Sequence, residues 1–191
     1  MASGVIAAGT TTTIMANWTD APEVVFGSGD YLVTFENRNV SGYWEVIFGA
    51  RVDTDGALIG SPFQISDKTY AEVFPAISFD GDNFMTTWIR QNGTEYRVAG
   101  RRVSTAGVVL DASDSVMPDG KGFGTQNNPD IAAGNNGFLV VWDDMTAFDG
   151  VISSNIFGAR VDATGVVQDP AGVVVSSATD GQYDPAAAFD G

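Results

Sequence analysis

Cysteine and histidine are both absent from this chain of 191 residues. Their absence excludes disulfides, thiolate chemistry, zinc sites built on those two residue types, and every Ser-His or Cys-His nucleophile pair. The Gly-rich stretch at residues 119–126 lacks the Gly-Lys-Ser/Thr ending of a phosphate-binding loop. We therefore predict neither a cofactor nor a metal site.

Basic residues are also scarce, because 24 Asp and Glu residues stand against 9 Lys and Arg residues, for a formal net charge of −15. Such a surface repels nucleic acid and anionic membranes, since phosphate groups are bound through lysine and arginine. Residues 1–8 are mildly apolar but lack a basic segment and a long hydrophobic run. They predict neither a signal peptide nor a membrane span, so a signal for export would lie outside this sequence.

What the chain does contain is an internal repeat. The segment Pro22–Phe35 aligns without a gap with Pro75–Trp88 and with Pro129–Trp142. A fourth copy begins at Pro185, and the four prolines lie 53, 54 and 56 residues apart. A period of about 50 residues with several strands per unit is typical of β-propeller blades rather than of helical solenoids.

Each repeat predicts four strands. A short run of small or apolar residues follows the proline, then come a Gly/Asp/Asn turn and a second strand with alternating faces. Aromatic residues stand nine and thirteen positions after each proline, and we expect them to pack blade against blade. No helical period occurs over a useful length. The sequence predicts an all-β, propeller-type fold of four-stranded antiparallel blades.

The repeat divides the chain into three complete blades, at residues 22–74, 75–128 and 129–184. Residues 1–21 are predicted to supply the outer strand of a partial blade and a connection, and residues 185–191 the inner strand of another. Closed propellers have about four to eight blades, and open sheet edges pair with other chains. We therefore predict a homo-oligomer, most simply a dimer, that completes the ring. The alternative is a fragment of a longer repeat protein.

The pattern at residues 75–88, Pro-Ala-Ile-Ser-Phe-Asp-Gly-Asp-Asn-Phe followed by Trp88, continues into a Gly-Ala-Arg-Val-Asp motif and a glycine turn in the first and third copies. It resembles a repeat that is common in large secreted bacterial proteins, where it occurs in tandem arrays. The resemblance implies a β-propeller and an extracellular or cell-surface location. It implies no catalytic residue, because the pattern consists of packing and turn positions. The chain departs from the pattern at Phe35 and at Ala133-Gly134.

Two neighbouring aromatic residues are the best candidates for ligand contact. Tyr43 and Trp44 do not recur in the other repeats, and they lie in a variable loop between strands. Variable loops on a rigid scaffold are where binding residues gather. The competing interpretation is a hairpin that packs on its own blade.

Two further patterns are interpreted as structural. Asp53-Thr-Asp-Gly56 resembles the start of a calcium loop, but its carboxylate cluster is not repeated, which favours a simple turn. Arg51, Arg102 and Arg160 recur at equivalent positions and could bind an acidic ligand. The 24 acidic residues offer many internal partners, so we expect structural ion pairs.

Carboxylates are the remaining groups suited to acid–base chemistry. Asp143 and Asp144 follow the core residue Trp142, and Glu36 is the equivalent of Asp143 in the first repeat. Neighbouring residues on a strand point to opposite faces, so we do not expect Asp143 and Asp144 to act as a pair. A solvated strand end is the favoured interpretation.

The sequence therefore predicts a non-catalytic binding or structural module, and not an enzyme. Its expected partner is a second copy of itself, with carbohydrate as a further candidate. Two alternatives stay open: a lectin-like propeller, and a glycan-processing enzyme that uses carboxylates.

Overall fold

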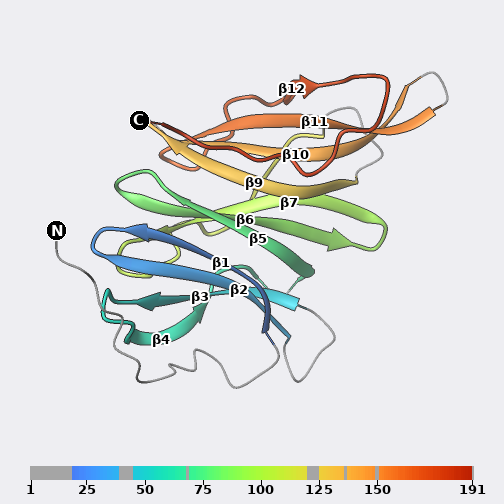
Figure 1. Ribbon diagram of the computed structural model, residues 1–191. Helices are drawn as coiled ribbons and strands as arrows, with labels where there is room; N and C mark the ends of the chain where they lie inside the picture. The colour runs from blue at the N-terminus through green and yellow to red at the C-terminus, as the bar shows by residue number, and fades with distance from the viewer. Residues whose placement is uncertain are drawn as a thin grey trace.

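The computed structural model describes residues 19–38, 45–67, 69–119, 125–135, 137–148 and 151–190. These residues form three four-stranded antiparallel sheets and no helix, which confirms the predicted all-β class (Figure 1). Within these ranges there is accordingly no helix that could cross a bilayer. The outer strand predicted for residues 1–21 lies largely outside the described residues.

Each sheet is built from four strands that follow one another in the chain. The first contains β1 (Thr19–Gly27), β2 (Asp30–Arg38), β3 (Glu45–Val52) and β4 (Leu58–Gln64). The second contains β5 (Ala71–Phe79), β6 (Asn83–Asn92), β7 (Glu95–Ser104) and β8 (Ser115–Val116). The third contains β9 (Gln126–Gly134), β10 (Gly137–Phe148), β11 (Val151–Asp162) and β12 (Val173–Ser176). The sheets are stacked in chain order, with β1 beside β5 and β5 beside β9 (Figure 1).

The first strand of every sheet carries a bulge at the proline of the repeat. The ladder between β1 and β2 gains one extra residue between Asp20 and Glu23, and the ladders of β5 and β9 do so at the same place. Proline has no N–H to give to a ladder, so a bulge is where a strand tolerates it. For this reason each first strand begins before the proline, whereas the sequence predicted that it would follow.

The sequence predicts the fourth strand directly after the glycine turn of each repeat, at residues 57–59, 108–110 and 166–167, and the structure places it differently in the second and third sheets. The runs 108–110 and 166–167 form only isolated bridges, at Val109 and Val167, and the paired strands β8 and β12 come later. The reason is that an aspartate side chain, and not the backbone of a neighbouring strand, accepts a hydrogen bond from the third strand. Asp111 accepts a hydrogen bond of 2.7 Å from the Arg102 N–H, and Asp169 accepts one of 2.8 Å from the Arg160 N–H.

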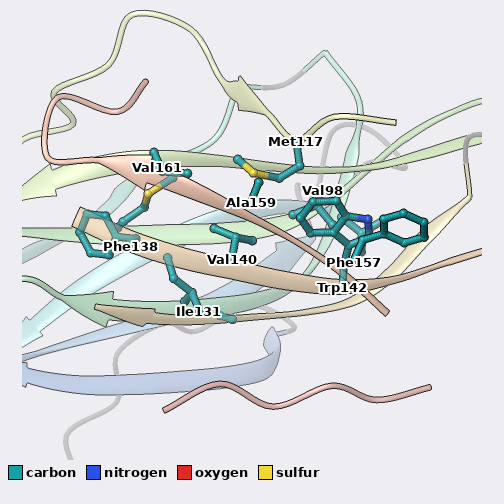
Figure 2. Packing of buried hydrophobic residues seen from close by; sticks show 12 residues of the cluster. Val98, Met117, Ile131, Phe138, Val140, Trp142, Phe157, Ala159 and Val161 are labelled. Atoms are coloured by element: carbon teal, nitrogen blue, oxygen red, sulfur yellow. The ribbon is translucent and has the colours of Figure 1, made fainter. Parts of the chain in front are cut away.

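The hydrophobic core lies between the stacked sheets, as predicted from the aromatic residues of the second and third repeats. In the first repeat the prediction was wrong for Tyr31, which is 38% exposed. Leu32 and Ile47 of the first sheet pack with Phe84 and Trp88 of the second. On the other side of the second sheet, Met85, Ile89 and Val98 pack with residues of the third, shown in Figure 2: Ile131, Phe138, Val140, Trp142, Phe157, Ala159 and Val161. Trp88 and Trp142 are fully buried. The aromatic residues therefore hold sheet to sheet.

Candidate functional site

A cleft of about 330 Å³ lies where the first strands of the three sheets meet the beginning of the fourth repeat. Its wall is made by residues at or next to the proline of each of the four repeats: Ala21, Glu23, Phe74, Pro75, Ala76, Asn128, Pro129, Asp130, Asp184 and Pro185. Because the first strands lie side by side, the repeat brings equivalent positions of all four copies to one place. The cleft therefore forms because the repeats place equivalent residues side by side along the first strands; we call it the axial cleft.

The residue before each proline adopts a left-handed backbone conformation. The φ angles are 45° at Ala21, 55° at Phe74, 47° at Asn128 and 52° at Asp184. Positive φ is a clear outlier for a bulky side chain such as that of Phe74, and such strain gathers at functional sites. The Phe74 side chain lines the cleft and is 59% exposed, so an aromatic ring faces solvent there.

Two carboxylates from different sheets share the cleft. Glu23 remains exposed, yet partial burial and then repulsion from Asp130 raise its pKa above the ordinary value. Asp130 accepts a 2.9 Å hydrogen bond from the Ile131 N–H and a 2.7 Å hydrogen bond from the Ala187 N–H. The first group is biased toward the acid form, whereas the second is held in place by backbone donors.

Two buried carboxylates, Glu36 and Asp143, form hydrogen bonds with bulge residues of the cleft. Glu36 is 5% exposed and accepts a 2.8 Å hydrogen bond from the Phe74 N–H. Burial raises its pKa, that hydrogen bond lowers it, and repulsion from Asp20 and Glu45 raises it further. Asp143 accepts hydrogen bonds from Asn128 Nδ2, at 2.8 Å, and from Ser154 Oγ, at 3.0 Å.

These contacts correct the prediction of a solvated strand end. Asp143 is 1% exposed and Asp144 is fully buried. Gln126 Nε2 lies 3.5 Å from Asp144 Oδ2, whereas Asp143 is bound by Asn128. The two neighbouring carboxylates contact different partners. Asp143 holds Asn128, a bulge residue that lines the cleft.

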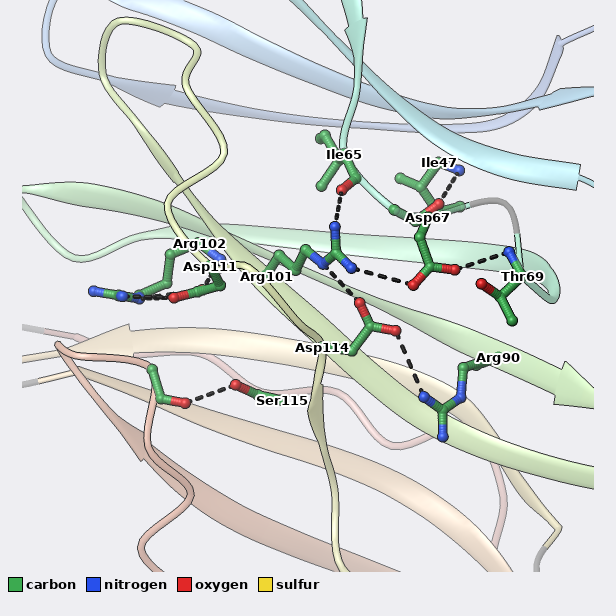
Figure 3. Close-up of polar contacts among 12 residues, drawn as sticks. Ile47, Ile65, Asp67, Thr69, Arg90, Arg101, Arg102, Asp111, Asp114 and Ser115 are labelled. Atoms are coloured by element: carbon green, nitrogen blue, oxygen red, sulfur yellow. Dashed lines mark hydrogen bonds and ion pairs between the residues drawn. The ribbon is translucent and has the colours of Figure 1, made fainter.

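A second polar cluster joins the first two sheets (Figure 3). Arg101 of β7 donates to Asp114 Oδ1 at 2.7 Å, to Asp67 Oδ2 at 3.3 Å and to the Ile65 carbonyl at 3.2 Å. Glu72 is fully buried beside it, and neither of its carboxyl oxygens has a hydrogen-bond partner among the described residues. Burial raises the pKa of Glu72 to about 8, the nearby Ser66 hydroxyl opposes the shift, and repulsion from Asp114 and Asp67 adds to it.

The repeated arginines form ion pairs within their own sheets, as expected. Arg51 pairs with Asp30, Arg102 lies 2.6 Å from Asp111, and Arg160 lies 2.8 Å from Asp169. The Asp53 turn also has the expected structure, because Asp53 Oδ1 accepts hydrogen bonds from Asp55 N and Ala57 N. In the part of the chain that the structure describes, no group of three or more acidic side chains is arranged to hold a metal ion.

The predicted ligand-contacting residues, Tyr43 and Trp44, lie outside the described residues, so that choice stays a prediction. The sequence analysis missed Glu23, Phe74 and Asp130. The signal that could have found them is their position directly before or after the repeated prolines. The proline is the same in every repeat, whereas the residues on either side of it differ in type from one repeat to the next.

Comparison with known proteins places the fold. No protein family matches the sequence, and no curated protein does. Among solved structures, an α-L-arabinofuranosidase from Lactobacillus brevis matches with a TM-score of 0.57 at 14% identity, over 92% of this chain and 61% of its own. An endo-arabinase from Bacteroides thetaiotaomicron matches with a TM-score of 0.55 at 12% identity, over 82% of this chain and 62% of its own. A Bacillus subtilis arabinanase matches with a TM-score of 0.54 at 16% identity, over 89% and 64%.

These neighbours are β-propeller glycoside hydrolases, and the likeness shows that this chain has the propeller fold. The chain spans only 61%, 62% and 64% of their lengths. The prediction that the chain is not an enzyme is contradicted by these matches and is withdrawn. The search for paired carboxylates had stayed within one strand, whereas Glu23 and Asp130 line one cleft from two different repeats.

Proposed function

We propose that this chain is a glycan-processing propeller module, and that its axial cleft binds and cleaves an arabinose-containing polysaccharide. The observation that carries the proposal is the presence of Glu23 and Asp130 in one cleft, on a fold shared with arabinanases. In a chain without histidine or cysteine, the 24 Asp and Glu residues are the most abundant groups for acid–base chemistry, and glycoside hydrolysis is performed by two carboxyl groups.

We assign the two carboxyl groups different roles in this reaction. Glu23, whose pKa is raised, protonates the glycosidic oxygen as the bond from that oxygen to the anomeric carbon breaks. Asp130, as a carboxylate, accepts the proton of the water that attacks the anomeric carbon, or attacks that carbon itself before water releases the sugar. Either route adds one water across one glycosidic bond.

Phe74 supports carbohydrate as the substrate class. Its exposed ring lies in the same cleft as the two carboxylates, where the apolar face of a sugar can stack on it. Glu36 and the bulge hold that ring in position through the Phe74 N–H. Polysaccharides are encountered outside cells, so we keep the extracellular location as part of this proposal.

The test is release of reducing sugar from arabinan, and from xylan and cellulose as comparisons, with the wild-type chain, Glu23→Gln, Asp130→Asn and the control Asp53→Asn. Asp53 caps a turn and does not line the cleft. We expect activity on arabinan that both cleft variants reduce at least a hundredfold and that the control leaves unchanged. Equal activity in all variants, or no release from any polysaccharide, contradicts the proposal.

A further inference from the structure

Asn128, the residue before the proline of the third repeat, combines a left-handed backbone with an exposed side chain. Its φ angle is 47°, and it lines the axial cleft together with Glu23 and Asp130. Asparagine adopts the left-handed conformation at less cost than most residues. The backbone is not the whole explanation for this residue, because its side chain is also held by a specific contact.

A buried carboxylate fixes the orientation of the Asn128 amide group. Asn128 Nδ2 donates a 2.8 Å hydrogen bond to Oδ1 of Asp143, whose other oxygen accepts a 3.0 Å hydrogen bond from Ser154 Oγ. Both Asp143 and Ser154 are buried. A carboxylate only accepts hydrogen bonds, so the NH₂ end of the amide, and not its oxygen, has to face Asp143.

The amide oxygen of Asn128 is therefore turned away from Asp143. Within the part of the chain that the structure describes, no hydrogen bond reaches this oxygen. An amide oxygen accepts up to two hydrogen bonds, and Asn128 lines the cleft. The contact with Asp143 thus leaves an acceptor in a fixed orientation at the wall of the cleft.

The remaining polar side chains of the cleft suit a ligand that donates hydrogen bonds. They are the carboxyl groups of Glu23, Asp130 and Asp184, and no described lysine or arginine lines the cleft. In their ionised form carboxyl groups are acceptors only. A ligand that matches these groups brings donors and no negative charge, and the hydroxyl groups of a neutral sugar meet both conditions.

A carboxylate at the same position of the first repeat also fixes a residue of the cleft. Glu36 is the equivalent of Asp143, and Phe74 is the equivalent of Asn128 in the second repeat. Glu36 holds Phe74 through its backbone N–H, whereas Asp143 holds Asn128 through its side chain. In the second repeat Ile89 occupies this position, so the fold also accepts an apolar residue there.

We propose that Asn128 contacts the substrate, because its Oδ1 accepts a hydrogen bond from a sugar hydroxyl, and that Asp143 is a positioning residue that acts through Asn128. This inference rests on the proposed function, since it takes the axial cleft as the glycan site. A residue that acts only through Asn128 has no further effect on binding once the Asn128 side chain is removed. The two roles can therefore be separated by a double-mutant cycle.

The test is calorimetric titration with an arabinan oligosaccharide, with Glu23→Gln as the background protein so that the ligand is not consumed. Asn128→Gly keeps the left-handed backbone and removes the amide, and we expect it to bind about tenfold more weakly. Asp143→Ile, which copies Ile89, should weaken binding about as much. The double variant should bind no more weakly than either single variant.

Two further variants make the result specific. Asp143→Asn still offers an oxygen to Asn128 Nδ2, so it should bind the oligosaccharide like the background protein. Asn92→Gly is the control for loss of an asparagine side chain, because Asn92 is exposed at the end of β6 and does not line the cleft. It should bind like the background protein as well.

Undiminished affinity of Asn128→Gly overturns the substrate contact and leaves the proposed function standing. Additive losses in the double variant, or failure of Asp143→Ile to fold, overturn the positioning role, because Asp143 then acts on the fold and not through Asn128. The expected binding pattern without release of reducing sugar by the wild-type chain overturns the proposed cleavage and supports this inference. Absence of binding by the background protein and by the wild-type chain overturns both.

Discussion

The backbone N–H of Phe74, in the second sheet, donates a hydrogen bond of 2.8 Å to Oε1 of Glu36, in the first. A carboxylate that is 5% exposed thereby holds a residue whose φ angle is 55° and whose ring is 59% exposed. The hydrogen bond fixes the bulge at Phe74, so the exposed Phe74 side chain is held in one position at the cleft. It links the stacking of the sheets to the geometry of the axial cleft.

Removing that acceptor should loosen the bulge. Glu36→Ala leaves the Phe74 N–H without a partner, and we expect it to lower the free energy of unfolding by about 1–3 kcal/mol. Glu36→Gln keeps an acceptor oxygen and removes a buried charge, so it should be neutral or stabilising at pH 7. Urea unfolding of both variants checks this. Equal destabilisation by the two would show that the charge, and not the hydrogen bond, matters.

The buried carboxyl of Glu72 should make stability depend on pH. Its pKa is about 8 in the folded protein, against 4.5 as the ordinary value. Between these values the folded protein keeps a proton that the unfolded chain releases, so stability falls as pH rises, by about 1.4 kcal/mol per unit and by up to about 5 kcal/mol in all.

Glu72→Gln should remove this slope between pH 5 and pH 8 and raise the stability at pH 8. Gln126 already occupies the equivalent position in the third sheet, where it bonds the Val98 N–H and the Pro118 carbonyl. A neutral amide therefore fits. Urea titrations at several pH values give the slope, and the same slope in both proteins would refute the assignment to Glu72.

Replacement by alanine should affect stability differently at two equivalent glycines, Gly27 and Gly134. In Gly27→Ala the new Cβ meets the Phe79 ring at 2.5 Å, and we expect a loss of about 1–3 kcal/mol. In Gly134→Ala the Cβ meets no atom of the described residues within 4 Å, and we expect a change within about 0.5 kcal/mol. Thermal unfolding of the two variants makes the comparison, and a similar loss in both would contradict the packing described.

Two arginines should differ in the same way. Arg101 bridges two sheets through Asp114, Asp67 and the Ile65 carbonyl, and its side chain is 11% exposed. Arg101→Ala leaves Asp114 poorly compensated, so we expect a loss of about 3 kcal/mol. Arg160 is 69% exposed in its pair with Asp169, and Arg160→Ala should change stability far less than Arg101→Ala, because solvent screens an exposed pair. Urea unfolding of both at low and high salt decides the matter, and an equal loss would contradict the bridging role.

The architecture could be predicted because the signals for it are repeated. The aromatic residues of the second strands recur at fixed distances from the prolines, and those of the second and third repeats, such as Trp88 and Trp142, are buried between the sheets. The strand starts were misplaced because the prediction treated proline as a boundary. In the structure the proline lies inside the strand, at a bulge. No local residue pattern predicts such a bulge.

The candidate site could not be predicted by the same reasoning. Its carboxylates, Glu23 and Asp130, stand in different repeats, more than one hundred residues apart, and only the stacking of β1, β5 and β9 brings them together. Asp143 and Asp144 attracted attention because they are adjacent in sequence, yet they contact different partners. Burial, too, depends on the neighbouring sheet, and this is why a solvated strand end was expected there.

The most direct test of a glycan site at the axis is calorimetric titration of the chain with an arabinan oligosaccharide. Phe74→Ala is compared with Phe26→Ala, since Phe26 is 53% exposed on β1 and does not line the cleft. We predict that wild type and Phe26→Ala bind alike, and that Phe74→Ala binds about tenfold more weakly, a difference of about 1.4 kcal/mol. Equal affinity of all three proteins, or no binding by the wild-type chain, would contradict the account.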